Sequence, residues 1–387
     1  MAAPTTTRAT LRRMICRQLA MPFYRLYETS LTADAGSSTS QLVDADLTQP
    51  EHYWEGSWIY GPSTETIRQI VNFEASGNKA LPNRAFAASF ASNEYEILTG
   101  WNVYSIHNAI NRAIEKAFPA FYDLAEEELL VLQEDRLEYS LAPGTAVANG
   151  SDGVLNYAPY KILNVAIERP SKSKTGNVAS AAATTVTLET GVDLTDVTSS
   201  WYASVYDGTG RGQFRKVISV TGQQVTISSG ATNWTTTPDT TSKIHLWDPT
   251  DEVYRWNPIW AVKFDRKAYP TLMHFSQRYP GAYGCRIRLR YIYKPAALTT
   301  EDSTTVVPAE FIVPYAVSML AGERAGLNKY DRDRYTKMRV DFMTEAEQFK
   351  ANNYWNIPQG TAWQERDPVG RVGYFPEPGD PLGWRSH

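Results

Sequence analysis

The stretch WIYGPSTETIRQIV, residues 58–71, is matched later in the chain by YASVYDGTGRGQFRKVI, residues 202–218. Each stretch has an aromatic segment, a turn that contains glycine, and an arginine among alternating apolar residues. The spacing from tyrosine to arginine is 8 residues in one copy and 9 in the other. Both copies begin near an Asp-Leu pair and end on a short apolar segment, at 95–98 and 243–247. A self-similar unit of this kind predicts a modular chain that carries one β-rich insert twice.

Size and composition narrow the class of protein. The chain has 387 residues, enough for two or three domains. With 21% charged residues and a net charge of -4, it is neither a disordered acidic chain nor a basic nucleic-acid coat. No apolar run approaches the roughly 18 residues of a membrane span, and Arg17 interrupts the apolar residues that a secretion signal would need. Eleven tryptophans and 23 tyrosines favour large contact surfaces, with other subunits or with carbohydrate.

Apolar residues spaced three to four apart predict the helices. The first runs from Thr5 to Ala20, and Thr5, Thr6 or Thr7 can cap it. The second runs from Trp101 to Phe118, capped by Thr99 or Asn102, and a helical hairpin begins at Pro308. The first helix carries four arginines away from its apolar stripe. These arginines are Arg8, Arg12, Arg13 and Arg17. They are expected to be solvated or salt-bridged, and contact with DNA or with an acidic partner is the alternative.

Alternating residues predict the strands outside the inserts. A strand pair is expected at 128–141 with its turn at Glu134–Arg136, and further strands at 160–167, 259–264 and 286–293. The polar segment 171–185 is low in large apolar residues and predicts a linker. On the last strand three arginines share one face, where they are candidates to pair with acidic residues of a neighbouring subunit: Arg286, Arg288 and Arg290.

The sequence gives no sign of catalytic or metal chemistry. The five histidines are isolated, and both cysteines, Cys16 and Cys285, are expected to be reduced and buried. The Gly208–Gly212 segment lacks the ending of a phosphate-binding loop and predicts a tight turn. The carboxylates at 126–128 are expected on a solvated surface. Four aromatic residues could form a platform on which a sugar stacks, but such residues in strands are more often core or subunit contacts: Tyr202, Tyr206, Trp234 and Trp247. We therefore expect no enzyme, no metal and no cofactor.

The last segment, 355–387, is rich in proline and has scattered apolar residues, which predicts an extended arm. Exposed aromatic residues on such an arm suit anchors that enter pockets of another subunit. The candidates are Trp363, Tyr374, Phe375 and Trp384.

The order of elements resembles one known family. After a short N-terminal helix comes a helix with the pattern Trp101…Ile106…Ala109-Ile110…Ala113. The strand pair follows, with the pattern Leu129-Val131…Glu138-Tyr139-Ser140-Leu141-Ala142-Pro143. The late helix has the pattern Val307-Pro308-Ala309-Glu310…Tyr315-Ala316…Leu320-Ala321. This order is similar to that of the head-to-tail adaptor (connector) proteins of tailed bacteriophages, over about half of the chain. The resemblance implies a helical bundle that docks beneath the portal ring and a C-terminal segment that reaches into the portal.

What the resemblance implies is a structural virion protein at the head–tail junction, made in the host cytoplasm. It would form a homo-oligomeric ring, expected to have twelve copies, and contact portal and tail or neck proteins. DNA would pass through the ring with only transient contact, and no contact with a membrane is expected. The chain is long for an adaptor, so a tail or fibre-attachment protein that binds carbohydrate through its aromatic inserts is the alternative.

The sequence thus predicts an α+β fold. It combines a small helical bundle, central antiparallel strands, two β-rich inserts of barrel or sandwich form, and an extended arm. The predicted parts are a bundle from 1–30, 99–126 and 308–354, a first insert at 31–98, a central β region at 127–170 and 249–307, a second insert at 171–248, and the arm at 355–387.

Overall fold

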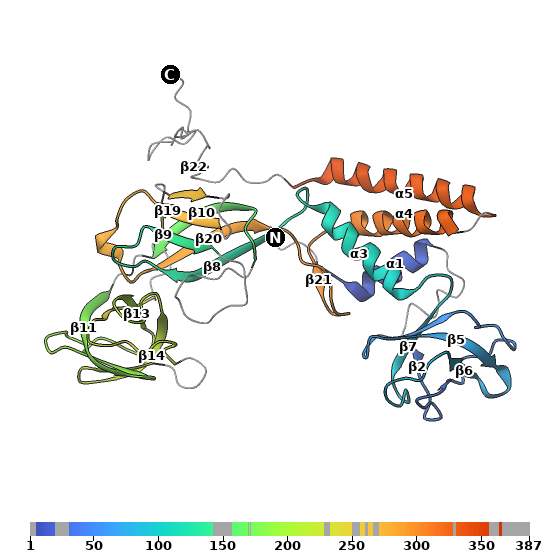
Figure 1. Ribbon diagram of the computed structural model, residues 1–387, viewed down its shortest axis with the longest axis horizontal. Helices are drawn as coiled ribbons and strands as arrows, with labels where there is room; N and C mark the ends of the chain where they lie inside the picture. Colours follow the sequence, from blue (N-terminus) through green and yellow to red (C-terminus); the bar gives the residue numbers. More distant parts are fainter. Residues whose placement is uncertain are drawn as a thin grey trace, which may run out of the picture. The chain divides into compact units, whose positions relative to one another are not determined.

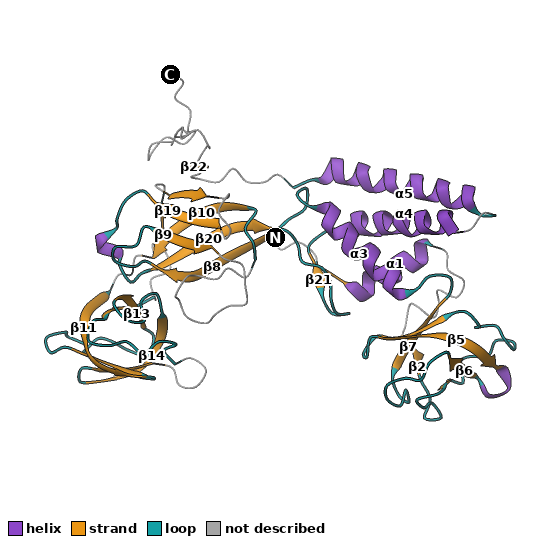
Figure 2. Cartoon of the chain, in the orientation of Figure 1, coloured by secondary structure: helices purple, strands orange, loops and turns teal. Residues whose placement is uncertain are grey.

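The fold was analysed in a computed structural model. It describes residues 5–19, 31–141, 157–168, 170, 172–227, 233–249, 256–259, 262–265, 271–327, 330–355 and 364–365. The chain is α+β, with helices and many antiparallel strands (Figure 2). It divides into two compact units, Met1–Asp123 with Lys294–Asn356, and Leu124–Tyr293 with Ile357–His387. Each unit is described by itself below.

The helices of the first unit form where the apolar spacing predicts them. Helix α1 spans Arg8–Gln18, and the hydroxyl of Thr7 accepts a hydrogen bond from the N–H of Thr10. Helix α3 spans Val103–Ala117, and the side chain of Asn102 caps it by accepting from the N–H of Tyr104. The hairpin consists of α4, Ala309–Leu327, and α5, Arg332–Asn353. The connection between the two helices therefore lies after Leu327.

Helix α4 is the centre of the bundle. It packs against α1, α3 and α5, and it is buried on nearly every side because its sequence is apolar all round (Figure 1). Helix α5 instead presents one stripe to the core, and only Ala346 on it is fully buried. The stripe agrees with the predicted spacing and consists of Tyr335, Met338, Phe342, Ala346 and Phe349.

Trp355 belongs to this bundle. Its ring meets Phe121 edge-on, with ring centroids 5.5 Å apart, and Tyr122 at 5.4 Å. Its backbone N–H also donates to the carbonyl of Ala120. Trp355, which was predicted as the first residue of the arm, therefore packs in the bundle, because the aromatic residues that receive its ring lie far away in the sequence.

The first unit also contains a six-stranded sheet, in the order β2-β7-β4-β5-β6-β3 (Figure 1). A separate two-stranded sheet joins β1, Thr6–Thr7, to β21, Thr304–Thr305. The six strands are β2 Leu31–Thr32, β3 Leu42–Val43, β4 Trp58–Gly61, β5 Thr66–Glu74, β6 Lys79–Pro82 and β7 Glu94–Leu98. Apolar side chains of this part of the chain, among them Trp54 and Phe73, form one buried core cluster.

The second unit contains a closed six-stranded barrel, in the order β11-β12-β15-β14-β13-β16. Its strands are β11 Ser173–Ala182, β12 Thr185–Leu188, β13 Tyr202–Asp207, β14 Phe214–Thr221, β15 Gln224–Ile227 and β16 Lys243–Trp247. The predicted linker at 171–185 was wrong, since most of it is β11. This strand pairs with β16 along one part and with β12 along the other, so its backbone is bonded although only Val178 in it is buried.

The two β-rich parts share one topology. If β11 is read first, the barrel runs β11-β16-β13-β14-β15-β12, which is the order of the first sheet strand for strand. The pairings also coincide: Ile59 lies opposite Arg68, as Ala203 lies opposite Arg215. Both copies have a register shift at the same place, and the residues there, Val71 and Ile218, are exposed at 54% and 45%. The predicted repeat is therefore confirmed in strand order and register.

Two four-stranded sheets complete the second unit. One has the order β17-β10-β20-β8, with β17 Trp256–Pro258, β10 Lys161–Glu168, β20 Arg286–Tyr293 and β8 Asp123–Val131. The other has the order β22-β18-β19-β9, with β22 Gln364–Glu365, β18 Val262–Asp265, β19 Thr271–Phe275 and β9 Glu138–Leu141. Inward-facing side chains of both contribute to one core cluster.

Two strand predictions need correction. β8 and β9 lie in different sheets, so 128–141 is no hairpin, because each strand finds its partners elsewhere in the sequence. The strand predicted at 259–264 begins at Val262, and Ile259 follows β17 instead. By contrast, the bounds of β20 are as predicted.

Candidate functional site

Two of the four arginines of α1 are buried. The Arg12 side chain is 1% exposed, and its guanidinium donates from Nε to Glu96 Oε2 at 3.0 Å and from Nη2 to Oε1 at 2.9 Å. Its Nη1 also donates to Glu301. Arg8 pairs with Glu301 and Glu65. The expectation that these arginines are solvated or salt-bridged is therefore confirmed for Arg8 and Arg12 as ion pairs, but the two are buried and not on a surface. Arg13 is half-buried and Arg17 is exposed.

These ion pairs belong to a network that joins α1, α3, the first β-sheet and the segment before α4. Tyr60 donates its hydroxyl to Glu301 at 2.7 Å, and the Arg12 guanidinium lies 4.7 Å from the Tyr60 ring centroid. Burial, followed by the charges of Arg8 and Arg12, lowers the pKa of His107 to about 3. Burial would raise the pKa of Glu301, but Arg12, the Tyr60 hydroxyl and His107 together lower it. The folded network therefore holds Glu301 ionised and His107 neutral.

The arginines of β20 differ from one another in the same way. Arg286 donates from Nε to Glu168 Oε2 at 2.9 Å and from Nη2 to Oε1 at 3.1 Å, and it also pairs with Glu128. Glu168 is fully buried. Arg288 pairs with Glu126 at 3.3 Å and is half-buried, whereas Arg290 is exposed. β20 is an interior strand of its sheet, and Arg286 has its acidic partners within the same unit.

The acidic run at 126–128 is the partner of these arginines. It lies in β8, next to β20, where the side chains of Glu126 and Glu128 reach the arginines and Glu127 accepts the hydroxyl of Tyr291 at 2.6 Å. Glu127 is only 7% exposed. The expected solvated surface was therefore wrong for Glu127, because strand pairing places this run against a basic and aromatic strand.

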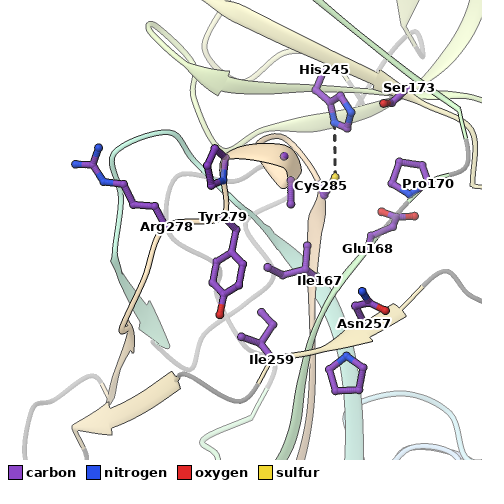
Figure 3. A pocket seen from close by; sticks show the side chains of 14 residues that line it. Ile167, Glu168, Pro170, Ser173, His245, Asn257, Ile259, Arg278, Tyr279 and Cys285 are labelled. Atoms are coloured by element: carbon purple, nitrogen blue, oxygen red, sulfur yellow. Dashed lines mark hydrogen bonds between the residues drawn. The ribbon is translucent and has the colours of Figure 1, made fainter. Parts of the chain in front are cut away.

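A cavity of about 530 Å³ lies in the second unit (Figure 3). His245, Cys285, Glu168 and Tyr279 line it, together with residues of the segment 278–282. Cys285 Sγ and His245 Nδ1 are 4.0 Å apart, and both residues are buried. The sequence does not indicate this proximity, because the two residues lie 40 positions apart, His245 on β16 and Cys285 in the turn before β20. The expectation that both cysteines are buried and free is confirmed.

The chemistry of this cavity does not resemble a nucleophilic site. Burial lowers the pKa of His245 to about 4, although a hydrogen bond to the Gly284 backbone and the charge of Glu168 oppose the shift, so the imidazole is neutral near pH 7. Both oxygens of Glu168 accept from Arg286, so this carboxylate is committed to an ion pair. The arrangement instead joins β16 to the turn before β20, where Gly284, at φ +85°, leaves room for the imidazole ring.

Equivalent positions of the two repeats make these junctions. Tyr60 and Glu96 in the first copy correspond by register to Ser204 and His245 in the second. In the first copy, Glu96 accepts from Arg12 and Tyr60 donates to Glu301. In the second copy, Ser204 donates to the carbonyl of Gly284 at 2.6 Å. The guanidinium of Arg286 also lies over the rings of Tyr202, Phe214 and Trp247 at 5.2, 5.6 and 6.0 Å. Each copy therefore uses the same face to attach to its own unit, with a buried arginine at the contact.

The other candidates also have structural roles. Trp201 and Trp234 lie in the barrel core, and Trp247 is buried at the contact with Arg286. The favoured prediction that such aromatic residues are core is therefore confirmed for Trp234, and neither Trp234 nor Trp247 is exposed as a sugar platform requires. The glycines between β13 and β14 make a turn, as predicted, and a strand follows rather than a helix. Trp363, Tyr374, Phe375 and Trp384 lie outside the described residues.

The described part of the chain contains no cluster of three or more histidine, cysteine or acidic residues arranged to hold a metal ion. Within the same ranges, every helix is too short or too polar to cross a membrane. Comparison with known protein families and with curated proteins gives no match for this chain.

Proposed function

We propose that this chain is a structural subunit of a tailed-bacteriophage virion, a head-to-tail adaptor that forms a ring between portal and tail. One observation carries the proposal. Helices from the first third of the sequence and from its last fifth pack into a single bundle around α4, while the β-rich parts interrupt the chain between them. This is the arrangement that the resemblance to adaptor proteins implies.

The buried ion pairs support a load-transmitting subunit. Arg12 joins α1 to Glu96 on β7 and to Glu301, and Arg286 joins β20 to Glu168 on β10. Breaking such a pair leaves an uncompensated buried charge and costs about 3–5 kcal/mol, so each joint resists movement. A ring subunit that carries force between head and tail needs joints of this kind. Its repeated contact would be heterologous, with one face of each copy meeting a different face of the next.

In this proposal the aromatic residues Trp363, Tyr374, Phe375 and Trp384 of the C-terminal arm enter the adjoining ring, whereas β22 pairs with β18 within its own unit. Arg290, which is exposed, is the arginine of this set proposed to contact acidic neighbours, since Arg8, Arg12, Arg13 and Arg286 pair with carboxylates within their own units. A net charge of -4 suits a channel wall that lets DNA pass, because tight phosphate contact needs clustered Lys and Arg.

The test uses the full chain, a chain that ends at Trp355, and a purified portal ring. Native mass measurement and electron microscopy should find the full chain as a ring on the portal, with twelve copies. The shortened chain keeps the Trp355 contacts with Phe121 and Tyr122, so it should fold but fail to join. A full chain that stays monomeric with every portal or tail ring would refute the adaptor. A shortened chain that joins normally would remove the role of the arm alone.

A further inference from the structure

Helix α5 carries exposed charged side chains that form no ion pair with the other described residues. Residues 332–340 include four basic residues and one acidic residue, Asp333, whereas residues 341–349 include three acidic residues and no basic one. None of these charged residues forms an ion pair with a described side chain, although ion pairs are frequent elsewhere in the unit. Arg334, Lys337, Asp341 and Glu345 are all exposed and follow one side of the helix at spacings of three and four.

This order of charges is unfavourable within a single helix. Arg334 and Lys337 are like charges three apart, and Asp341 and Glu345 are like charges four apart, each costing about 0.2–0.5 kcal/mol. Lys337 precedes Asp341, which is the weaker orientation for a pair four apart. The first and last turns of α5 carry Asp333 and Lys350, as the helix dipole favours, so the unfavourable pairs lie in the middle of the helix. Charges arranged in this way call for opposite charges from outside the helix.

The same order is self-complementary when the helix is turned end for end. The basic Arg334 and Lys337 of one copy then face Glu345 and Asp341 of the other, and each contact occurs twice. From these relations we propose that the free chain pairs with a second copy of itself through antiparallel contact of the two α5 helices.

The size of the contact sets its strength. A 22-residue helix is about 33 Å long. One helix laid against another buries less than the roughly 1,200 Å² of a stable complex, so the pair is weak and its stability depends on charge. A two-fold contact cannot be the repeated contact of a cyclic ring, which is heterologous. The pairing therefore belongs to the chain before it enters any ring, and it does not depend on the proposed function.

Charge reversal provides the test. One variant carries R334E and K337E, and a second carries D341K and E345R. Each should lose the self-association of the full chain, measured by sedimentation over a series of concentrations at low salt, because four contacts become repulsive. An equimolar mixture of the two variants should associate again, since every contact between unlike copies is then attractive. The wild-type association should weaken about tenfold or more as salt is raised to 0.5 M.

Two controls keep the result interpretable. R211E with K216E changes the charge equally at exposed positions of the second unit and should leave association unchanged. Far-ultraviolet circular dichroism checks that every variant keeps its helices. Orientation is read from cysteine cross-linking: R334C should cross-link to E345C in a mixture more readily than R334C to itself. A wild-type chain that is monomeric at every concentration, variants that associate like wild type, or a mixture that stays monomeric would each overturn the proposal.

Discussion

The guanidinium of Arg12 and the carboxylate of Glu96 form a bidentate ion pair in which both side chains are 1% exposed. The two residues are 84 positions apart, one on α1 and the other on β7. Their contact fixes the first β-sheet to the helical bundle within one unit, so its loss should be felt across that unit. It also defines the first prediction.

Replacing Arg12 with Met should lower the free energy of unfolding of the first unit by about 3 kcal/mol or more, because Glu96 is left buried without its main partner. Adding Glu96→Gln should recover part of the loss, since the unpaired charge disappears. Arg17→Met, on the exposed side of the same helix, should cost less than about 0.5 kcal/mol. Urea unfolding followed by tryptophan fluorescence measures all three. Equal effects of the Arg12 and Arg17 variants would contradict the importance of the ion pair.

The buried histidines should make stability fall as the pH is lowered. The pKa of His107 is lowered to about 3 in the folded chain, so between its unfolded value near 6.5 and pH 3 only the unfolded state binds the proton. Unfolding is therefore favoured by up to about 1.4 kcal/mol per pH unit below 6.5. His107→Gln should flatten this slope between pH 6.5 and about 5.5, where unperturbed carboxylates are still largely ionised.

His245 supplies a matched comparison in the second unit, where burial lowers its pKa to about 4. His245→Gln should flatten the pH dependence of the second unit, and His107→Gln that of the first. Hydrogen exchange, measured at several pH values on peptides from each unit, separates the two effects. A change in the wrong unit, or an unaltered slope in both, would speak against this assignment.

Arg68 and Arg215 should act alike, because they occupy the same position of the repeat. Arg68 donates from Nε to the carbonyl of Ala85, and Arg215 from Nε to that of Asn233, both at 3.0 Å. Each also donates from Nη1 to the carbonyl of the preceding residue. Replacement by Ala should raise hydrogen exchange in 83–93 for the first copy and in 233–242 for the second.

The loss of stability should be larger at Arg215, at about 2 kcal/mol, because this side chain is buried whereas Arg68 is half-buried. Lys216→Ala, at the next position and exposed, is the control and should change neither exchange nor stability. Unchanged exchange in 233–242 of the Arg215 variant would show that the segment is held by other contacts.

Arg286 and Arg290 lie on the same strand and should respond differently to one conservative change. Arg286→Lys keeps the charge but loses the two-pronged contact with the buried Glu168, and it should cost about 2 kcal/mol in thermal or urea unfolding of the second unit. Arg290→Lys should be neutral within about 0.5 kcal/mol. A neutral Arg286 variant would mean that Glu168 finds another partner.

Chains that end at Trp355 and at Asn353 should differ in stability, although only two residues separate them. The longer chain keeps the ring contacts of Trp355 with Phe121 and Tyr122, and the shorter one loses them. The expected difference is about 2 kcal/mol or more in the unfolding of the bundle. Equal melting temperatures would place Trp355 outside the cooperative core.

Much of the fold was predictable from local pattern. The stripe Leu11, Ile15 and Leu19, the caps Thr7 and Asn102, and the alternation in 286–293 all gave the right elements, because helix and strand periods are properties of neighbouring residues. Strand partners were less accessible. The segment 128–141 was assigned to a hairpin because its two strands are adjacent in sequence, yet β8 and β9 pair in different sheets.

The candidate contact residues show the same division. Sequence placed Arg8, Arg12 and Arg286 on surfaces because arginine is seldom buried without a partner. Their partners are Glu301, Glu96 and Glu168, between 84 and 293 positions away. Glu96 lies between the apolar residues Tyr95 and Ile97 in β7, and a carboxylate in that position was a sequence signal of a buried ion pair.

The sequence by itself determined that one β-rich unit occurs twice, between segments that form helices, since strand alternation, turn glycines and the paired arginines are written in local order. Only the tertiary structure decided what each copy is attached to and which arginines remain accessible. The physical reason is that burial of a charge depends on a counter-charge brought close by folding. Arg12 and Arg286 found one, and Arg290 stayed exposed.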